Sequence, residues 1–181
     1  MFDRKRREFT IRLRRRPSPR TALTAGAILL AGVGMSTLAP GQDRSAAIVK
    51  DAIFARKIVM VSIGQNMDEI EGMMASPKGV DMAEGREHAD NISIMLMAFP
   101  HLFPADTNQW KPNVDRDPGR DTYAAPELWT NYADFYARAA QTSKVAYNAS
   151  RAQQENAFKT FAIELRAACD SCHAAYLKAD Q

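Results

Sequence analysis

The chain has few of the residues from which proteins build metal sites and cross-links. Its 181 residues include two cysteines and three histidines. A structural zinc site would need two further ligands beside the cysteines, and His88 and His101 stand singly and far from them in the sequence. No segment keeps an alternation of apolar and polar residues, so we expect no β-strands. No stretch of the sequence repeats itself, which excludes the repeat architectures.

A strong excess of charge of one sign occurs only at the N-terminus. The whole chain holds 24 basic and 21 acidic residues. Residues 1–39 contain nine of the basic and two of the acidic residues, whereas residues 40–181 contain 15 and 19. The body is therefore mildly acidic, with a net charge of −4. It lacks the basic face that nucleic-acid binding requires, and we expect no nucleic-acid partner.

Residues 1–39 are typical of an export signal. An arginine-rich segment over residues 1–20 precedes an apolar stretch of small residues over 21–39. This stretch is short for a full membrane span. Ala39 suits a signal peptidase, although Pro40 directly after it is unfavourable. We predict a cleaved export signal, with a retained N-terminal anchor as the alternative; only the anchor would bring the protein into contact with a membrane.

The body, residues 44–181, shows the periodicity of four helices. Apolar residues recur at steps of three and four in four stretches, over residues 48–74, 81–99, 126–147 and 158–176. Pro77 and Gly79 end the first helix, and Pro126 opens the third. Short joins make neighbouring helices antiparallel. We therefore predict an all-α, antiparallel up-and-down four-helix bundle with one long loop, residues 100–125, between the second and third helices.

One motif in the last helix indicates a specific chemistry. Cys169-Asp170-Ser171-Cys172-His173 is the Cys-x-x-Cys-His attachment sequence of c-type haem. Two cysteines at this spacing on a helix face the same way, so both can form thioethers to the vinyl groups of one porphyrin. His173 follows Cys169 by one turn and brings its imidazole beneath the iron as an axial ligand. We predict one covalent haem c, held by Cys169 and Cys172 and ligated by His173.

A disulfide and a zinc site are the other interpretations of the two cysteines. Redox Cys-x-x-Cys motifs usually lie where a strand meets a helix, and no strand is predicted here. A zinc ion lacks its further ligands. Thioether attachment of haem takes place outside the cytoplasm on a chain that has not yet folded. The haem interpretation therefore also favours secretory export and a periplasmic location.

A second axial ligand of the iron must come from upstream of His173, because no methionine follows it in the sequence. The candidates are Met60, Met67, Met73, Met74, Met82, Met95, Met97, His88 and His101. Methionine is a common core filler, so each of these methionines alone is more often packing than a ligand.

Four short patterns accompany the haem motif. They are Arg56-x-x-x-Met60 followed by Gly64 and Met67, Leu102-Phe103-Pro104, Pro126-Glu127-Leu128-Trp129, and His173-x-x-Tyr176. Together with the haem motif they resemble the class II c-type cytochromes, the family of cytochromes c-prime and their low-spin relatives. The resemblance covers residues 44–181. It implies a four-helix bundle with the haem motif near the C-terminus of its last helix.

The resemblance implies roles for four more residues. Met60 would lie on the distal face of the haem, as an iron ligand in low-spin members or as a gate over an empty sixth site in high-spin members. Arg56 would lie near a haem propionate, with which a guanidinium can pair. Trp129 would pack at the haem edge, and Tyr176 would be a further contact of the cofactor.

Two features depart from the family's common pattern. Leu177 stands where the family often has an arginine, four residues beyond the axial histidine. The loop around Trp110 and residues 115–121 resembles the extended loop of low-spin members. Together with Met60, this loop favours a six-coordinate iron with histidine and methionine ligands.

We predict a periplasmic electron carrier that is not an enzyme and that exchanges electrons with redox partner proteins. The acidic body would favour a basic docking surface on the partner. The alternative is a five-coordinate haem protein that binds nitric oxide or carbon monoxide, with Met60 as a steric gate. A peroxidase or reductase would need a distal acid or base, whereas the first helix offers apolar side chains around Met60. The resemblance is also compatible with a homodimer through the first and second helices. No feature of this sequence specifies such an interface.

Overall fold

The computed structural model describes residues 41–114 and 123–178. The predicted export signal, residues 1–39, and the loop segment 115–121 lie outside the described residues. Within the part that is described, no helix is both long enough and apolar enough to span a membrane.

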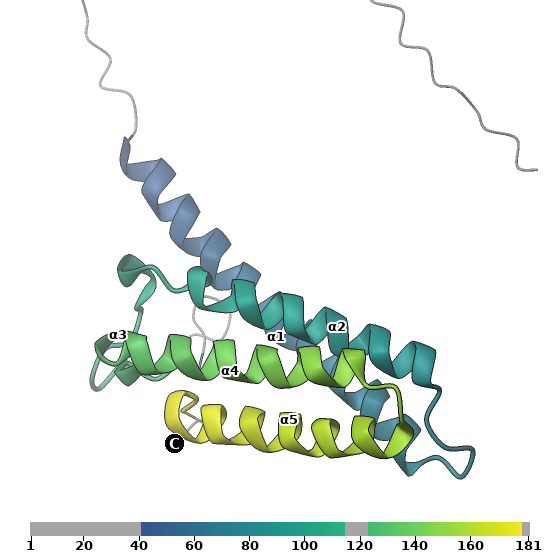
Figure 1. The fold of residues 1–181 in the computed structure, drawn as a ribbon. Helices are drawn as coiled ribbons and strands as arrows, with labels where there is room; N and C mark the ends of the chain where they lie inside the picture. Colours follow the sequence, from purple (N-terminus) through teal and green to yellow (C-terminus); the bar gives the residue numbers. More distant parts are fainter. Residues whose placement is uncertain (1–40, 115–122, 179–181) are drawn as a thin grey trace, which may run out of the picture. The chain divides into compact units, whose positions relative to one another are not determined.

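Four long helices form the bundle (Figure 1). They are α1 (Gly41–Ala75), α2 (Met82–Ala98), α4 (Tyr132–Arg151) and α5 (Glu155–Tyr176). Three short helices, η1 (Phe99–Leu102), η2 (Ala105–Thr107) and α3 (Glu127–Thr130), lie between α2 and α4 in the chain. The predicted all-α four-helix bundle is confirmed.

The first join and the start of α2 follow from local chemistry. Gly79 adopts a positive φ of 79°, a conformation that glycine takes without the steric cost of a side chain. The Asp81 carboxylate then accepts hydrogen bonds from the backbone N–H groups of Ala83 and Glu84, at 2.9 and 3.2 Å. These bonds satisfy two donors that have no partner inside the helix. Pro100 falls in η1, where the α-helical pattern gives way to a tighter turn.

The structure divides the predicted third helix at Asn131. Its ψ of 37° lies outside the helical range and separates α3 from α4. Side chains on both sides of this break bind the preceding loop: Trp129 Nε1 donates to the Pro104 carbonyl at 3.2 Å, and Tyr132 Oη donates to the Pro100 carbonyl at 2.9 Å. The break therefore lets the start of the helix fold against the connection. Periodicity alone cannot predict this, because both halves keep the same apolar spacing.

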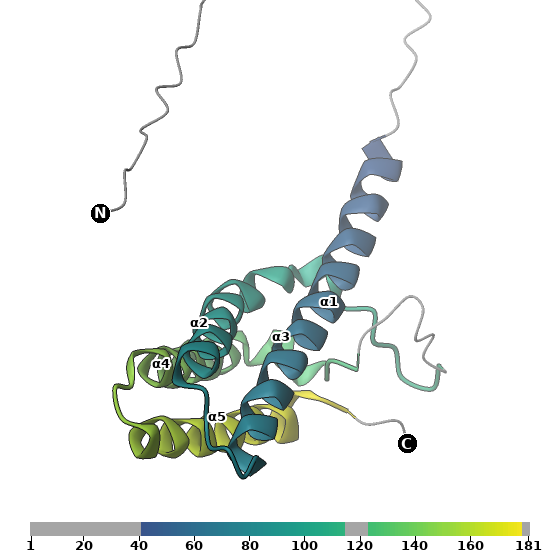
Figure 2. The same cartoon turned by 90° about the vertical axis from the view of Figure 1, so that its right-hand side faces the viewer.

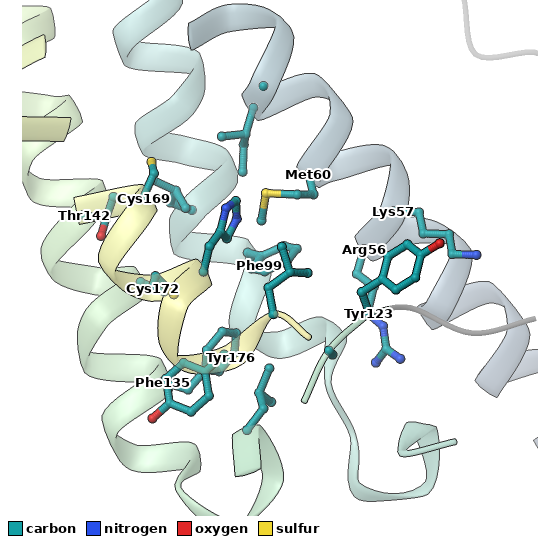
Figure 3. Close-up of a pocket in the computed structure, with 18 of the residues that line it drawn as sticks. Arg56, Lys57, Met60, Phe99, Tyr123, Phe135, Thr142, Cys169, Cys172 and Tyr176 are labelled. Carbon is teal, nitrogen blue, oxygen red and sulfur yellow. The ribbon is translucent and has the colours of Figure 1, made fainter. Parts of the chain in front are cut away.

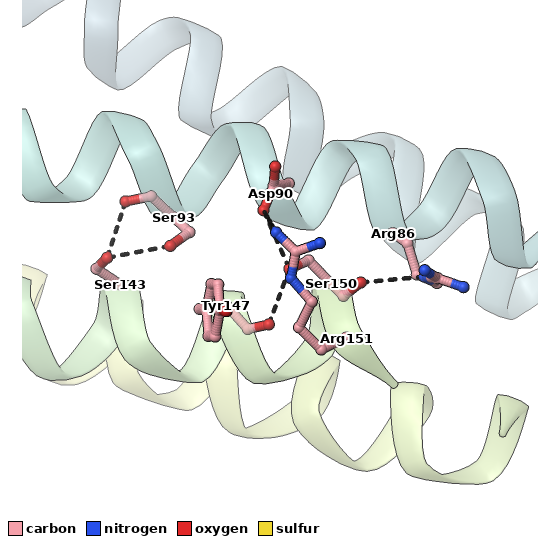
Figure 4. A network of polar contacts seen from close by, with 7 residues as sticks. All are labelled: Arg86, Asp90, Ser93, Ser143, Tyr147, Ser150 and Arg151. Carbon is pink, nitrogen blue, oxygen red and sulfur yellow. Dashed lines mark hydrogen bonds and ion pairs between the residues drawn. The ribbon is translucent and has the colours of Figure 1, made fainter. Parts of the chain in front are cut away.

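α2 and α4 are held together by small side chains and polar contacts (Figure 4). Ser143 Oγ donates to the Ser93 carbonyl at 2.8 Å, deep in this interface. Nearer the C-terminal end of α4, the Asp90 carboxylate contacts Arg151 at 3.0 Å, and Arg86 Nε donates to the backbone carbonyl of Ser150 at 3.0 Å. Buried hydroxyl groups cost little free energy when they are paired in this way. The space for a cofactor lies elsewhere in the bundle.

Candidate functional site

A cavity of about 470 Å³ opens between α1 and α5, with α2, η1 and α4 contributing to its walls. Its volume lies in the range of small-molecule and cofactor sites. Most of its lining is apolar, and aromatic rings from Phe99, Phe103 and Phe135 form one wall. These rings pack edge to face: the Phe99 and Phe135 centroids lie 5.1 and 5.0 Å from that of Phe103. The sequence analysis identified Phe103 only as part of the Leu102-Phe103-Pro104 pattern and did not place Phe99 and Phe135 at the site, because this wall depends on contacts between distant segments.

The haem motif lies in the wall of this cavity. Cys169, Cys172 and His173 all line it from the C-terminal half of α5 (Figure 3). Both thiols are free. Burial raises the pKa of the Cys169 thiol to about 11 and also raises the pKa of Cys172. Arg166 and Arg138 oppose these upward shifts in pKa without reversing them. A redox dithiol has a lowered thiol pKa, so this form of the disulfide interpretation loses support.

Met60 lines the same cavity from α1, with Ile63, Gly64 and Met67 beside it. Its side chain points into the cavity (Figure 3). A Cβ atom added at Gly64 would meet no atom within 4 Å, so this part of the wall leaves room for a bulky group. Met60 and Met67 are thus the two candidates for the second axial ligand that face the cavity.

The two upstream histidines lie outside the cavity lining. The His88 ring contacts the Asn66 side-chain oxygen through Nδ1, at 2.8 Å. The His101 ring packs against Tyr136, with the two centroids 5.9 Å apart. Both rings therefore have structural contacts away from the wall that carries Met60.

Arg56 lines the cavity one turn before Met60, and its side chain is only 1% exposed. Its guanidinium donates to Thr107 Oγ1 at 3.0 Å and to the Thr107 carbonyl at 3.2 Å. The guanidinium carbon also lies 4.6 Å from the centre of the Phe103 ring. These hydrogen bonds and the ring stabilise a cation that would be costly to bury alone. The contact between Arg56 and a haem propionate stays a prediction. The hydrogen bonds from Arg56 to Thr107 in η2 were not predicted from the sequence.

Trp129 is not among the residues that line the cavity, but it packs on Phe103, which is one of them. Its ring packs on Phe103, with the centroids 5.9 Å apart. The structure therefore places Trp129 as a support of the cavity wall, through Phe103.

Tyr176 lines the cavity and connects α5 to α4. Its hydroxyl donates to the Asp134 carboxylate at 2.5 Å, and Arg138 Nε donates to the same oxygen at 2.6 Å. Arg138 then reaches Ser171, inside the haem motif, at 3.1 Å. The hydrogen bonds from Tyr176 and Arg138 lower the pKa of Asp134, and burial raises the pKa of Tyr176. This network fixes the motif-bearing turns of α5 on α4, and Asp134 was not recognised from the sequence.

A short strap closes one edge of the cavity. The Ala125 N–H donates to the Tyr176 carbonyl and the Lys178 N–H to the Tyr123 carbonyl, both at 2.8 Å. Ala124 and Leu177 form an isolated antiparallel bridge, the one departure from helical structure that pairs two described segments. The loop predicted to lack structure thus contributes Tyr123 and Ala124 to the lining.

The residues of this cavity fit a covalently attached haem. Two thiols and an imidazole lie in one wall, and a thioether faces the cavity from another helix. The open space beside Gly64 and the aromatic wall suit a large flat apolar group. The same donors fit a zinc ion poorly, and the described residues contain no group of three histidine, cysteine or acidic side chains that could hold a metal ion.

Known proteins are similar to this chain in sequence and in fold. Residues 51–177 match the family model described as Cytochrome C'. Cytochrome c-556 of Agrobacterium fabrum is 30% identical over 123 residues, which are 67% of this chain and 77% of that protein. The crystal structure of cytochrome c' from Thermochromatium tepidum superposes with a TM-score of 0.64 at 21% identity, covering 72% of this chain and 97% of that one. Cytochrome c' from Rhodopseudomonas palustris superposes with a TM-score of 0.62 at 24% identity, covering 72% of this chain and 98% of that one.

Proposed function

Because this chain belongs to the cytochrome c' family, whose members carry one covalently bound haem c, we propose that it is an electron carrier with histidine and methionine ligands on the iron. Cys169 and Cys172 would hold the haem, which supplies reversible one-electron chemistry at its iron. The observation that carries the proposal is the placement of His173 and Met60 in the walls of one apolar cavity, on two different helices.

The protein's own residues support electron transfer in three ways. The network of Tyr176, Asp134 and Arg138 fixes the turns around His173, so the imidazole moves little when the charge of the iron changes. The Met60 thioether is neutral, and a methionine ligand raises the reduction potential. The apolar walls keep water from the iron, which limits the reorganisation that electron transfer requires.

We further propose that the protein is not an enzyme. Ile63, Met67 and Leu96 line the cavity with Met60, and none of these three side chains can donate or accept a proton in catalysis. Lys57 and Tyr123 are the lining residues outside the haem motif whose replacement should leave the spectrum unchanged if this is correct. Arg56 lies nearby, but its guanidinium is bound by Thr107.

A periplasmic location and a homodimer belong to the same proposal. Haem attachment outside the cytoplasm supports the location. The exposed side chains Phe54, Ile58 and Val61 form an apolar stripe along α1, which supports pairing of two copies through this helix. Redox partner proteins would dock where electrons can reach the cavity, and the acidic body favours a basic surface on them.

Binding of nitric oxide or carbon monoxide is the second candidate function. The same apolar wall favours it, because a displaced Met60 would leave a pocket for a small uncharged ligand on the iron. In that case Met60 is a gate, and the iron is five-coordinate at rest.

Replacing Met60 distinguishes these two functions. We expect Met60→Ala to convert a low-spin iron to high spin and to speed carbon monoxide binding, because the variant loses its sixth ligand. Met67→Ala is the matched control, since it also removes a methionine from the α1 wall. Absorption spectra and stopped-flow mixing with carbon monoxide measure both effects. If the spin state responds to Met67→Ala and is unchanged by Met60→Ala, Met60 is not the ligand.

A further inference from the structure

α1 and α5 lie close together at one end of the bundle and diverge towards the other (Figures 1 and 2). The cavity occupies the wider part of this wedge, where Met60 and His173 line it from the two helices. The distance between Met60 and a haem held on α5 therefore depends on the angle at which α1 leaves α5.

An ion pair joins the two helices at the edge of the cavity that faces the narrow end of the wedge, and Arg166 is one of the residues that line this cavity. Arg166 Nε and Nη2 donate to the two carboxylate oxygens of Glu71, at 2.6 and 2.9 Å. Glu71 lies about three turns after Met60 on α1, and Arg166 lies about two turns before His173 on α5. Such a two-bonded arginine–carboxylate pair fixes orientation as well as distance.

Packing beside this ion pair is incomplete. A gap of about 140 Å³ is lined by Met67 and Met74 of α1, by Ala162 and Ile163 of α5, and by the paired residues themselves. Interlocked side chains normally set the separation of two helices. On the inner side, Ile70 of α1 and Leu165 of α5 belong to one buried cluster that holds the helices together. On the outer side, where the pocket leaves the side chains less closely packed, the ion pair joins the two helices.

We propose that the Glu71–Arg166 ion pair is a strut that sets the angle between α1 and α5 and so holds Met60 within reach of the haem iron. The proposal rests on the proposed ligation of the iron by Met60. Glu71 is then a positioning residue: it lies outside the lining of the haem cavity and acts through α1. Loosening the strut shifts the protein towards a five-coordinate iron that is open to small ligands, which links the two candidate functions through one surface contact.

The expected effect is modest, because the two side chains are 43% and 40% exposed. Pairs with this exposure contribute little to stability. If the methionine-bound and the open forms of the iron are in equilibrium, a small change in their free-energy difference shifts the populations of the two forms. We expect Glu71→Gln to speed carbon monoxide binding about three- to fivefold and to raise the high-spin fraction of the ferric protein.

The test uses the full haem-loaded protein and a matched control. Asp90→Asn removes the charge from an ion pair of comparable exposure, 39% for Asp90 and 56% for Arg151, which joins α2 to α4 away from the cavity. This control should leave the spin state and the carbon monoxide rate unchanged. Glu71→Asp keeps the carboxylate and leaves Arg166, which lines the cavity, in place, so it should change both values less than Glu71→Gln does.

Two results would overturn the proposal: Glu71→Gln with the spectrum and carbon monoxide rate of the wild type, or Asp90→Asn with the same changes as Glu71→Gln. Failure of the proposed function is a separate result. If Met60→Ala shows that Met60 is not a ligand, the carbon monoxide rate alone decides on the strut, because α1 also lines the cavity that a small ligand must enter.

Discussion

Some side chains that line this cavity also form contacts between helices, and their sequence patterns predict only the first of these two roles. The Arg-x-x-x-Met pattern identified Arg56, and the structure shows its guanidinium bound to Thr107 and stacked on Phe103. Tyr176 was expected as a contact of the cofactor, and it also donates to Asp134 on another helix. The added contacts are with residues 51 and 42 positions away in the chain, where no local spacing rule applies.

The bond between Tyr176 and Asp134 predicts a pH dependence of stability. The pKa of Asp134 is lowered by the Tyr176 hydroxyl first and by Arg138 second, from an ordinary value of about 4. A carboxyl group whose folded-state pKa is lowered stabilises the fold above its unfolded-state pKa, and this contribution is lost as the pH falls through the folded-state pKa. We expect Tyr176→Phe to lose more stability at neutral pH than at a pH below the lowered pKa of Asp134.

Thermal melting at a series of pH values measures this difference. Tyr132→Phe is the control, because the Tyr132 hydroxyl donates to a neutral backbone carbonyl, that of Pro100, at 2.9 Å. Its cost should be the same at both ends of the pH range. Equal behaviour of the two variants would show that Asp134 gains nothing from Tyr176.

At the scale of helices, the sequence predicted what depends on periodicity and missed what depends on contacts between elements. The spacing of apolar residues identified the four long helices and the long connection after α2. It did not reveal the break at Asn131, because α3 and α4 share one apolar phase and are separated by contacts of Trp129 and Tyr132 with the loop. The strap at Tyr123 was also missed, since its backbone bonds to α5 form only after α5 is in place.

The cavity between α1 and α5 predicts that the fold depends on its cofactor. Replacing both Cys169 and Cys172 by alanine removes the thioether anchors, and an unfilled cavity of about 470 Å³ leaves the walls without packing partners. We expect the double variant to melt with a broader transition and a weaker near-ultraviolet circular dichroism signal than the wild type. The exchange Ser143→Ala removes the hydroxyl that donates to the Ser93 carbonyl in the α2–α4 interface, and this control should lower stability without broadening the transition. A double variant that melts as sharply as the wild type would mean that the haem is not part of the core.

In the whole molecule, the helix pair α2 and α4 and the helix pair α1 and α5 have different roles. Buried serines and alanines, together with the ion pair between Asp90 and Arg151, join α2 to α4 into a firm support. α1 and α5 instead enclose the cavity and carry Met60 and His173. The net charge of the body and the export signal bear on partners and location, which are properties of the protein in its cell and stay predictions.

The near-infrared and visible spectrum of the purified ferric protein tests the central claim most directly. A low-spin spectrum with the weak charge-transfer band of a methionine sulfur on ferric iron, absent in Met60→Ala, is the predicted result. It would show that α1 and α5 hold Met60 and His173 on the two faces of one haem. A wild-type spectrum that is already high-spin, together with rapid binding of nitric oxide, would contradict the account and make Met60 a gate.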